Sequence, residues 1–280
     1  MQQKITPPSQ EDWVNSKKYL KINDQVEMAY VEWGNPSGEP IFLIHGYSDS
    51  SRAYSTVAPL LQGARFIAPD LRGHGNTTAP NGAYGIQCLA EDISDFIDAL
   101  GYKRAKVVGH SMGSLTAGLL ASFYPEKVEK LILISSAVKM NPDVSKWLYE
   151  QIVTFAYPTD PNNGWLEREW AGNPNGIFDD VMMKLLRKEQ AAMPQRVWAS
   201  LLKAMDTLDW SHAARHITAP TLIMWGDQDT LMTEAEQGPL CQAIPHAIFK
   251  RYEGKGHSMY WEDPQEGAND IMDFLMASNL

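Results

Sequence analysis

Residues 109–113 read Gly-His-Ser-Met-Gly and follow the apolar pair Val107-Val108. A stretch with helical character, residues 115–124, comes directly after them. A serine hydroxyl becomes an effective nucleophile when it is exposed and has a base beside it. A sharp turn from strand to helix exposes the side chain, and the flanking glycines keep the neighbouring backbone clear of it. The pattern predicts that Ser111 is a nucleophile, provided that the chain also supplies a base, an acid and oxyanion donors.

His257 is the candidate base. It follows the last expected strand, residues 247–252, in a loop that also contains Gly254 and Gly256. Loops at the carboxyl ends of parallel strands carry functional side chains in α/β proteins. As general base, the imidazole would take the Ser111 proton during attack and return it to the leaving group.

Two carboxylates, Asp227 and Asp229, follow the preceding strand, residues 221–225. A carboxylate in this place would hold the imidazole in the right tautomer and stabilise its charged form. Asp229 lies three residues past Gly226, where a loop can turn back over the sheet, whereas Asp227 is placed to cap the turn or face solvent. The strand that ends at Ser135-Ser136 has no adjacent acid, so the orienting acid is expected in the 227–229 segment.

Two backbone N–H groups are the expected oxyanion donors. Met112, the residue after the nucleophile, supplies the first. The second is expected from the loop at residues 44–50, where Gly46 permits a turn that leaves the Tyr47 amide free to point at the site. Neither donor uses its side chain, so both side chains are interpreted as pocket wall.

These residues need an α/β scaffold to bring them together. Alternating short apolar strands and amphipathic segments predict a mostly parallel central sheet with helices on both faces. The expected strands are 18–22, 26–33, 40–44, 65–69, 107–108, 131–134, 221–225 and 247–252; the expected helices are 86–100, 111–124, 233–243 and 265–276; residues 51–61 form an amphipathic segment and residues 1–16 a polar, partly disordered arm.

Residues 138–218 break this alternation and predict an inserted helical cap, or lid, between the core segments 1–137 and 219–280. Apolar residues there recur at helical spacing, at Leu148, Ile152, Phe155, at Phe178, Val181, Met182, Leu185 and at Val197, Leu201, Leu202, Met205. An aromatic inner face on such a cap suits apolar acyl or ring substrates. The candidate substrate-binding side chains are Tyr47, Trp147, Trp170, Trp198 and Met259.

Composition excludes several classes of function. The chain has 280 residues and a formal charge of -10, which argues against a nucleic-acid or anionic-membrane partner. Its two cysteines, Cys88 and Cys241, favour free thiols in a reducing compartment. A polar start without an apolar stretch gives no secretion signal, and a cytoplasmic protein is expected. His212 and His216 have metal-ligand spacing but no third ligand, so neither a metal nor an organic cofactor is expected.

The order Ser111, Asp229, His257 is that of the α/β-hydrolases. The sequence resembles a small, helical-capped serine esterase or lactonase of this superfamily. The resemblance rests on motifs at residues 44–47, 70–75, 109–113, 226–229 and 256–257, which lie within residues 40–262. Haloalkane dehalogenases and epoxide hydrolases are similar too, but they carry an aspartate where this chain has Ser111.

The resemblance implies an α/β-hydrolase fold and a Ser-His-Asp triad in which Asp229, rather than Asp227, is the acid. It also implies hydrolysis of a carboxylic ester or lactone of a small apolar substrate through an acyl-serine intermediate. The alternatives are a thioesterase, a C–C bond hydrolase with the same triad, and a slow-turnover ligand-sensing receptor. The motif at residues 70–75 and the side chains of His45 and His110 are expected to be structural. The oligomeric state is left open.

Overall fold

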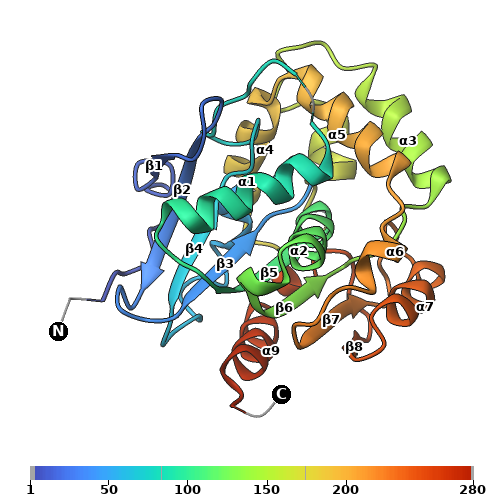
Figure 1. Ribbon diagram of the computed structural model, residues 1–280. Helices are drawn as coiled ribbons and strands as arrows, with labels where there is room; N and C mark the ends of the chain where they lie inside the picture. Colours follow the sequence, from blue (N-terminus) through green and yellow to red (C-terminus); the bar gives the residue numbers. More distant parts are fainter. Residues whose placement is uncertain (1–3, 83, 174, 279–280) are drawn as a thin grey trace.

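A single mixed sheet forms the centre of the computed structural model, which describes residues 4–82, 84–173 and 175–278 (Figure 1). The strands are β1 (Lys18–Lys21), β2 (Glu27–Gly34), β3 (Pro40–Ile44), β4 (Arg65–Pro69), β5 (Ala105–His110), β6 (Val128–Ile134), β7 (Thr221–Gly226) and β8 (Ile248–Tyr252). They are hydrogen-bonded in the order β1-β2-β4-β3-β5-β6-β7-β8. Pairing is antiparallel from β1 through β2 to β4 and parallel from β4 to β8. The expected α/β class and mostly parallel sheet are confirmed.

The parallel strands explain where the chemistry-bearing loops meet. The chain leaves β3 into residues 45–50, β5 into Ser111, β7 into Asp229 and β8 into His257. Because β3, β5, β6, β7 and β8 run in the same direction, all four loops emerge at one edge of the sheet. Strands β3, β5 and β7 are buried along nearly their whole length, as continuously apolar central strands should be.

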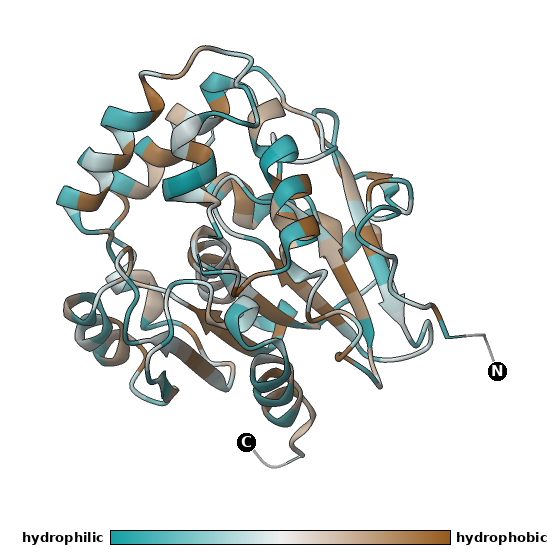
Figure 2. Ribbon diagram, turned by 180° about the vertical axis from the view of Figure 1, so that it is seen from behind, coloured by the Kyte–Doolittle hydropathy of each residue, from teal (hydrophilic) through white to brown (hydrophobic). Residues whose placement is uncertain are grey.

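Helices cover both faces of the sheet and its upper edge (Figure 1). They are α1 (Ile86–Ala99), α2 (Met112–Phe123), α3 (Pro142–Ile152), α4 (Asp180–Ala192), α5 (Gln195–Thr207), α6 (Ser211–Ala214), α7 (Glu234–Ala243), α8 (Met259–Glu262) and α9 (Pro264–Met276), with 3-10 turns at Ser51–Tyr54 and Pro125–Lys127 and a π-turn at Leu166–Trp170. One apolar core joins the sheet to α1, α2 and α7, and a second joins its other face to α8 and α9. Figure 2 shows brown, apolar strands between helices that are brown on one side and teal on the other.

Residues 138–218 contain α3 to α6, with α3, α4 and α5 lying beyond the upper edge of the sheet where the four loops emerge (Figure 1). The stripe expected around α4 is partly wrong. Val181 is 43% exposed, and Phe178 lies before the helix begins. The buried side of α4 instead carries Met182, Met183, Leu186 and Gln190, so the apolar face is rotated by about one residue from the expected one.

The expected polar arm at residues 1–16 is also wrong for its described part, residues 4–16. Ile5 forms a β-bridge with Gly34, and Trp13 is fully buried against Trp33 with ring centroids 5.9 Å apart. The Trp13 indole donates a hydrogen bond to Ser51 Oγ at 3.1 Å. One buried tryptophan supplies enough apolar contact to fix a segment whose composition is otherwise polar.

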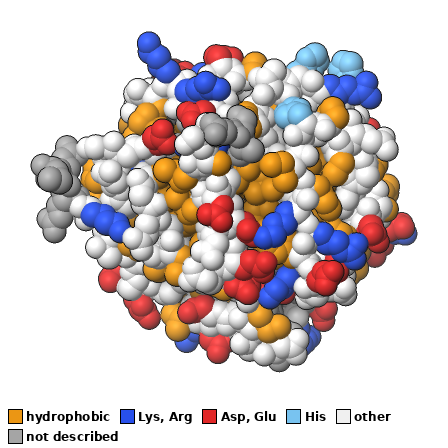
Figure 3. Space-filling model, turned by 90° about the horizontal axis from the view of Figure 1, so that it is seen from below, with side chains coloured by type: hydrophobic (Ala, Val, Ile, Leu, Met, Phe, Trp, Pro, Cys, Tyr) orange, Lys and Arg blue, Asp and Glu red, His pale blue; other side chains and the backbone are white. Residues whose placement is uncertain are grey.

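Charges of both signs are interspersed with apolar side chains on the face turned away from α3 and α5 (Figure 3). Within the described ranges, none of the helices has the length and apolar character needed to cross a bilayer. The same residues hold no cluster of three or more His, Cys, Asp or Glu side chains suited to a metal ion.

Candidate active site

Ser111 lies in a strained turn between β5 and α2. Its φ of 54° and ψ of -124° place it in a region that side chains other than glycine rarely adopt. The turn is so tight that a Cβ on Gly109 would lie 2.2 Å from the Gly113 carbonyl oxygen. A Cβ on Gly113 would lie 2.3 Å from the Ile44 carbonyl oxygen. Only glycine fits at both positions, which accounts for the Gly-x-Ser-x-Gly spacing. The strain is the kind that lifts a nucleophile above the sheet.

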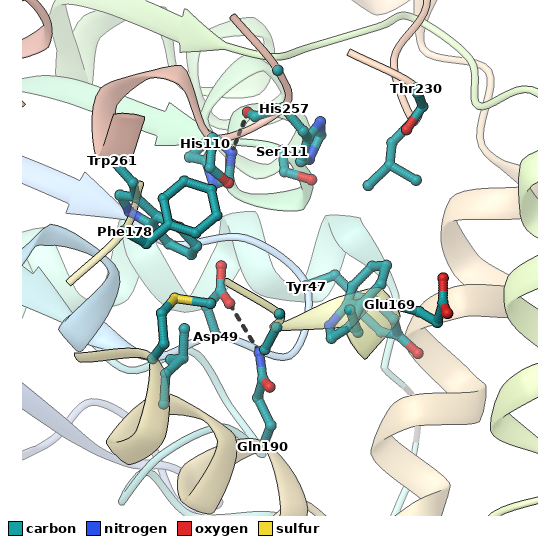
Figure 4. A pocket seen from close by; sticks show the side chains of 18 of the residues that line it. Tyr47, Asp49, His110, Ser111, Glu169, Phe178, Gln190, Thr230, His257 and Trp261 are labelled. Carbon is teal, nitrogen blue, oxygen red and sulfur yellow. Dashed lines mark hydrogen bonds between the residues drawn. The ribbon is translucent and has the colours of Figure 1, made fainter. Parts of the chain in front are cut away.

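His257 and Asp229 form a hydrogen-bonded pair beside Ser111. The His257 Nδ1 atom lies 2.8 Å from Asp229 Oδ2 and 2.9 Å from Oδ1. With Nδ1–H donating to the carboxylate, the Nε2 lone pair is left free, and Figure 4 shows the imidazole next to the Ser111 side chain. The arrangement can remove a proton from Ser111.

Asp229 is held as an anion by its surroundings. Burial raises the pKa of Asp229, but the His257 imidazole and the N–H groups of Leu231 and Met232 outweigh burial and leave this pKa below its usual value. Both N–H groups donate to Oδ1 at 2.9 Å. The carboxylate is therefore preorganised to balance an imidazolium on His257.

Asp227 has a different position. It accepts a hydrogen bond from Gly254 N–H at 2.8 Å and pairs with Arg251 at 3.1 Å. These contacts tie the loop after β7 to the loop that carries His257. Of the two acids that the sequence offers, the structure brings Asp229 to His257.

Two other histidines have contacts that fix the loops. His110 Nε2 donates to the His257 carbonyl at 3.0 Å. His45 Nδ1 donates to the Gly46 carbonyl at 2.8 Å, and its Nε2 accepts from Leu71 N–H at 2.9 Å. Asp70 is fully buried, pairs with Lys17 at 2.7 Å and accepts from Ser51 N–H at 2.8 Å. These contacts fix His45, Asp70 and one ring nitrogen of His110 in the scaffold, while His110 Nδ1 has no hydrogen-bond partner among the described residues.

The backbone amides of Tyr47 and Met112 are available as donors. Among the residues that the structure describes, neither N–H has a hydrogen-bond acceptor. The Met112 amide is in the first turn of α2, where helix geometry leaves N–H groups unpaired and positive. The close approach of Gly113 to the Ile44 and His45 carbonyls brings the 45–50 loop against this helix end.

A cavity of about 700 Å³ opens above Ser111 and His257 between the sheet edge and residues 138–218. Its walls include the aromatic side chains of Tyr47, Trp147, Trp170, Phe178 and Trp261. Tyr47 is fixed in place by a hydrogen bond from its hydroxyl to the Trp198 carbonyl at 2.6 Å. Figure 4 shows Phe178 and Trp261 on one side of the space in front of Ser111 and Tyr47 on the other.

Three of the five expected substrate-binding side chains, Tyr47, Trp147 and Trp170, line this cavity. Trp198 does not, because its ring is 1% exposed and packs behind Tyr47 with centroids 5.3 Å apart. Met259 does not either, because its side chain, 1% exposed, belongs to the core under α9.

Sequence reasoning missed Asp49, Phe178, Gln190 and Trp261, which do line the cavity. Phe178 and Gln190 come from the inserted segment, whose packing no short motif specifies. Asp49 could have been predicted, because it lies in the loop after β3, next to the expected oxyanion donor Tyr47. The sequence analysis considered only the backbone N–H groups of that loop. Trp261 follows His257 by four residues and lies in α8, the short helix directly after the loop that carries the base.

Three buried histidines make the fold sensitive to acid. Burial lowers the pKa of His45 and of His110 to about 3 and the pKa of His74 to about 4. An unfolded chain protonates all three near a pH of about 6.5, so unfolding takes up protons below that pH and stability falls as pH falls. Asp49 acts in the opposite direction. Burial raises its pKa to about 7, so below that pH the folded state holds a proton on Asp49 that the unfolded chain releases, and this release offsets the uptake of one proton.

We therefore expect the free energy of unfolding to fall by about 2 to 3 kcal/mol per pH unit between about pH 6 and pH 5. Urea unfolding followed by tryptophan fluorescence at closely spaced pH values measures this slope. A free energy that stays constant over the interval would contradict the buried, neutral state of the histidines.

Comparison with known proteins places the chain in a family. A family model described as alpha/beta hydrolase fold matches residues 39–264. Lipase 1 of Psychrobacter immobilis is 28% identical over 273 residues, covering 92% of this chain and 83% of the lipase. A serine hydrolase-like protein of Danio rerio is 37% identical over 107 residues, 37% of this chain and 33% of that protein. The crystal structure of the enol-lactonase from Burkholderia xenovorans LB400 superposes with a TM-score of 0.79 at 24% identity, covering 93% and 100% of the two chains.

Proposed function

Because the chain belongs to the alpha/beta hydrolase fold family, we propose that it hydrolyses a carboxylic ester or lactone of a small, largely apolar substrate, with Ser111, His257 and Asp229 as its catalytic triad. The observation that carries the proposal is the Asp229–His257 hydrogen bond of 2.8 Å beside a serine held at a φ of 54°. Relatives and structural neighbours whose names include lipase and enol-lactonase support ester hydrolysis in general.

In the proposed reaction, Ser111 Oγ attacks the ester carbonyl carbon while His257 Nε2 takes the hydroxyl proton. The carbonyl oxygen becomes an oxyanion that the Tyr47 and Met112 amides stabilise. When the C–O bond breaks, the same proton passes from His257 to the leaving alcohol and an acyl-serine remains. Water, deprotonated by His257, then attacks the acyl carbon and releases the acid, and the proton returns to Ser111. Asp229 balances the imidazolium charge in both halves.

The charged groups around the cavity favour ester or lactone hydrolysis over C–C bond hydrolysis. A C–C bond hydrolase that acts on dicarbonyl compounds would need basic groups to hold an enolate or a second carboxylate. Arg187 and Arg196 donate instead to the Ala171 and Ala79 carbonyls, at 3.0 and 2.6 Å. Arg168 does line the cavity, but Asp49, Asp143, Glu169 and Glu262 line it as well. Ester or lactone hydrolysis therefore suits the site better.

The proposal is tested by an activity screen with 4-nitrophenyl esters of increasing acyl length, simple lactones, a matched thioester and a dicarbonyl compound. We expect the oxyesters or lactones to give the highest kcat/KM, with turnover near the enzyme median of about 10 per second. The Ser111→Ala protein is the blank. A higher kcat/KM for the thioester or the dicarbonyl compound would overturn the choice of ester. Turnover below about one per minute on every substrate, with tight product retention, would instead favour a ligand-sensing receptor.

A further inference from the structure

Asp49 is a buried carboxyl group that has no countercharge among the residues that the structure describes. The structure describes five buried acidic side chains in residues 4–82, 84–173 and 175–278. Four of them have a cationic or imidazole partner: Glu32 with Arg65 at 2.6 Å, Asp70 with Lys17 at 2.7 Å, Asp92 with Arg72 at 2.5 Å and Asp229 with His257 at 2.8 Å. Asp49, the fifth, is 7% exposed and forms no ion pair among these residues. A buried charge without a partner is costly in free energy, which sets Asp49 apart from the other four buried acids.

The described residues around Asp49 give it hydrogen bonds but no cation. Its carboxylate accepts a hydrogen bond from Gln190 Nε2 at 3.4 Å and one from the Gly46 backbone. The guanidinium of Arg52 is already bound to Glu189 at 2.7 Å. Burial raises the pKa of Asp49 to about 7, even though His257 lowers it. The carboxyl is thus poised between its neutral and charged forms, and a nearby cation would hold it ionised.

Asp49 lies very close to the candidate nucleophile. A Cβ built on Gly46 would lie 3.0 Å from Asp49 Oδ2 and 3.2 Å from Ser111 Cβ, so both side chains pack against the same side of Gly46. Figure 4 shows the Asp49 carboxyl pointing into the cavity, with Phe178 and Trp261 on one side of it and Tyr47 on the other. One ligand in the cavity can contact both Ser111 and Asp49, because both residues line it.

The cavity wall carries more acidic than basic side chains and therefore favours a positively charged ligand. Four carboxyl groups and one guanidinium line it: Asp49, Asp143, Glu169, Glu262 and Arg168. Aromatic faces attract cations, and the effect strengthens when the cation leaves water. Two buried acceptors nearby lack a donor among the described residues: Gln190 Oε1, and His110 Nδ1, which lies 3.2 Å from the same Cβ position on Gly46. A ligand with N–H groups would complement them.

We propose that the Asp49 side of the cavity is a subsite for an alkylammonium group, and that the favoured substrates are esters carrying such a group. The proposal rests on the proposed ester hydrolysis for its functional meaning, but binding at the subsite is measurable without turnover. A hydroxyl group is the alternative ligand, because it could hydrogen-bond to the neutral form of Asp49 without supplying charge.

Calorimetric titration with benzylammonium, benzyl alcohol and benzoate separates these ligands, which share one ring and differ in charge and donors. At about pH 8 the Asp49 carboxyl is ionised and benzylammonium is still charged. We expect benzylammonium to bind at least about tenfold more tightly than benzyl alcohol, and benzoate to bind most weakly. Equal or tighter binding of benzyl alcohol would overturn the proposal and favour a hydroxyl subsite.

The variant Asp49→Asn keeps the shape of the side chain and removes its charge. It should reduce the ratio of benzylammonium to benzyl alcohol affinity by about tenfold or more. The control is Glu150→Gln, which also replaces a carboxylate with an amide, at an exposed position of α3 that is not part of the cavity wall, and it should change the ratio by less than about threefold. Equal effects of the two variants would contradict a specific role for Asp49.

A pair of substrates tests the wild-type protein directly. 4-(Aminomethyl)benzyl butyrate, with its amine protonated, and 4-ethylbenzyl butyrate have nearly the same shape and differ by one positive charge and its N–H groups. We expect a kcat/KM at least about tenfold higher for the aminomethyl ester, followed by proton release in a pH-stat. If both esters are cleaved at equal rates, the ammonium subsite fails and ester hydrolysis stands. If neither they nor the 4-nitrophenyl esters are cleaved while benzylammonium binds, the subsite stands and the proposed hydrolysis fails.

Discussion

Ser111→Ala is expected to lower kcat for ester hydrolysis by about 10⁶-fold, the largest effect of any single substitution in this chain. The substitution removes the atom that forms the acyl bond, so His257 and the oxyanion donors have no nucleophile to activate. The fold should be unaffected, because the β-carbon of alanine meets the same contacts as that of serine in the turn between β5 and α2.

The matched control is Ser122→Ala, at the far end of the same helix, where the hydroxyl donates to the Gly118 carbonyl at 2.8 Å. It should keep kcat within about twofold. Initial rates on the best 4-nitrophenyl ester from the substrate screen measure both variants. Wild-type rates in Ser111→Ala, in protein free of contaminating esterase, would remove Ser111 from the reaction.

Asp229→Asn is expected to lower kcat by about 10⁴-fold. An asparagine amide can donate to His257 Nδ1 and so stabilise the tautomer whose Nε2 carries the proton, which leaves no lone pair to accept a proton from Ser111. It also removes the charge that balances the imidazolium. The loss should appear in kcat much more than in KM, because the carboxylate contacts His257 rather than the substrate.

Asp227→Asn tests the same chemical change two residues away. Asp227 binds Gly254 N–H and Arg251. Its variant should lose no more than a few tenths of a kcal/mol of transition-state stabilisation, within about threefold in kcat. A larger loss in Asp227→Asn than in Asp229→Asn would show that the structure pairs His257 with the wrong acid.

Local patterns were sufficient to predict the sheet and the loops at its edge. Strands β3 and β4 begin and end at the expected residues, because Pro40 and Arg65 each start a short apolar run that ends at a turn. The position of Ser111 between β5 and α2 also followed from its flanking glycines, which the structure shows to be sterically required. In each case the determining contacts lie within a few residues of one another in the chain.

Features that depend on distant contacts were not predictable in this way. Trp13 is ordered by Trp33 and Ser51, and Trp198 is turned away from the cavity by packing behind Tyr47. That Asp49 forms no ion pair within the described part of the chain can be recognised only after the neighbouring cations have been placed. The shape of the cavity, and with it substrate choice, depends on such contacts.

The central claim, that Ser111 carries the acyl group, is tested most directly by covalent labelling with diethyl 4-nitrophenyl phosphate. This reagent transfers a phosphoryl group to an activated serine, and the product resists the hydrolysis that would release an acyl group. We expect release of one 4-nitrophenol per chain, parallel loss of esterase activity, and a single adduct on the peptide that contains Ser111. Inactivation with the adduct on another residue, or with no adduct on Ser111, would contradict it.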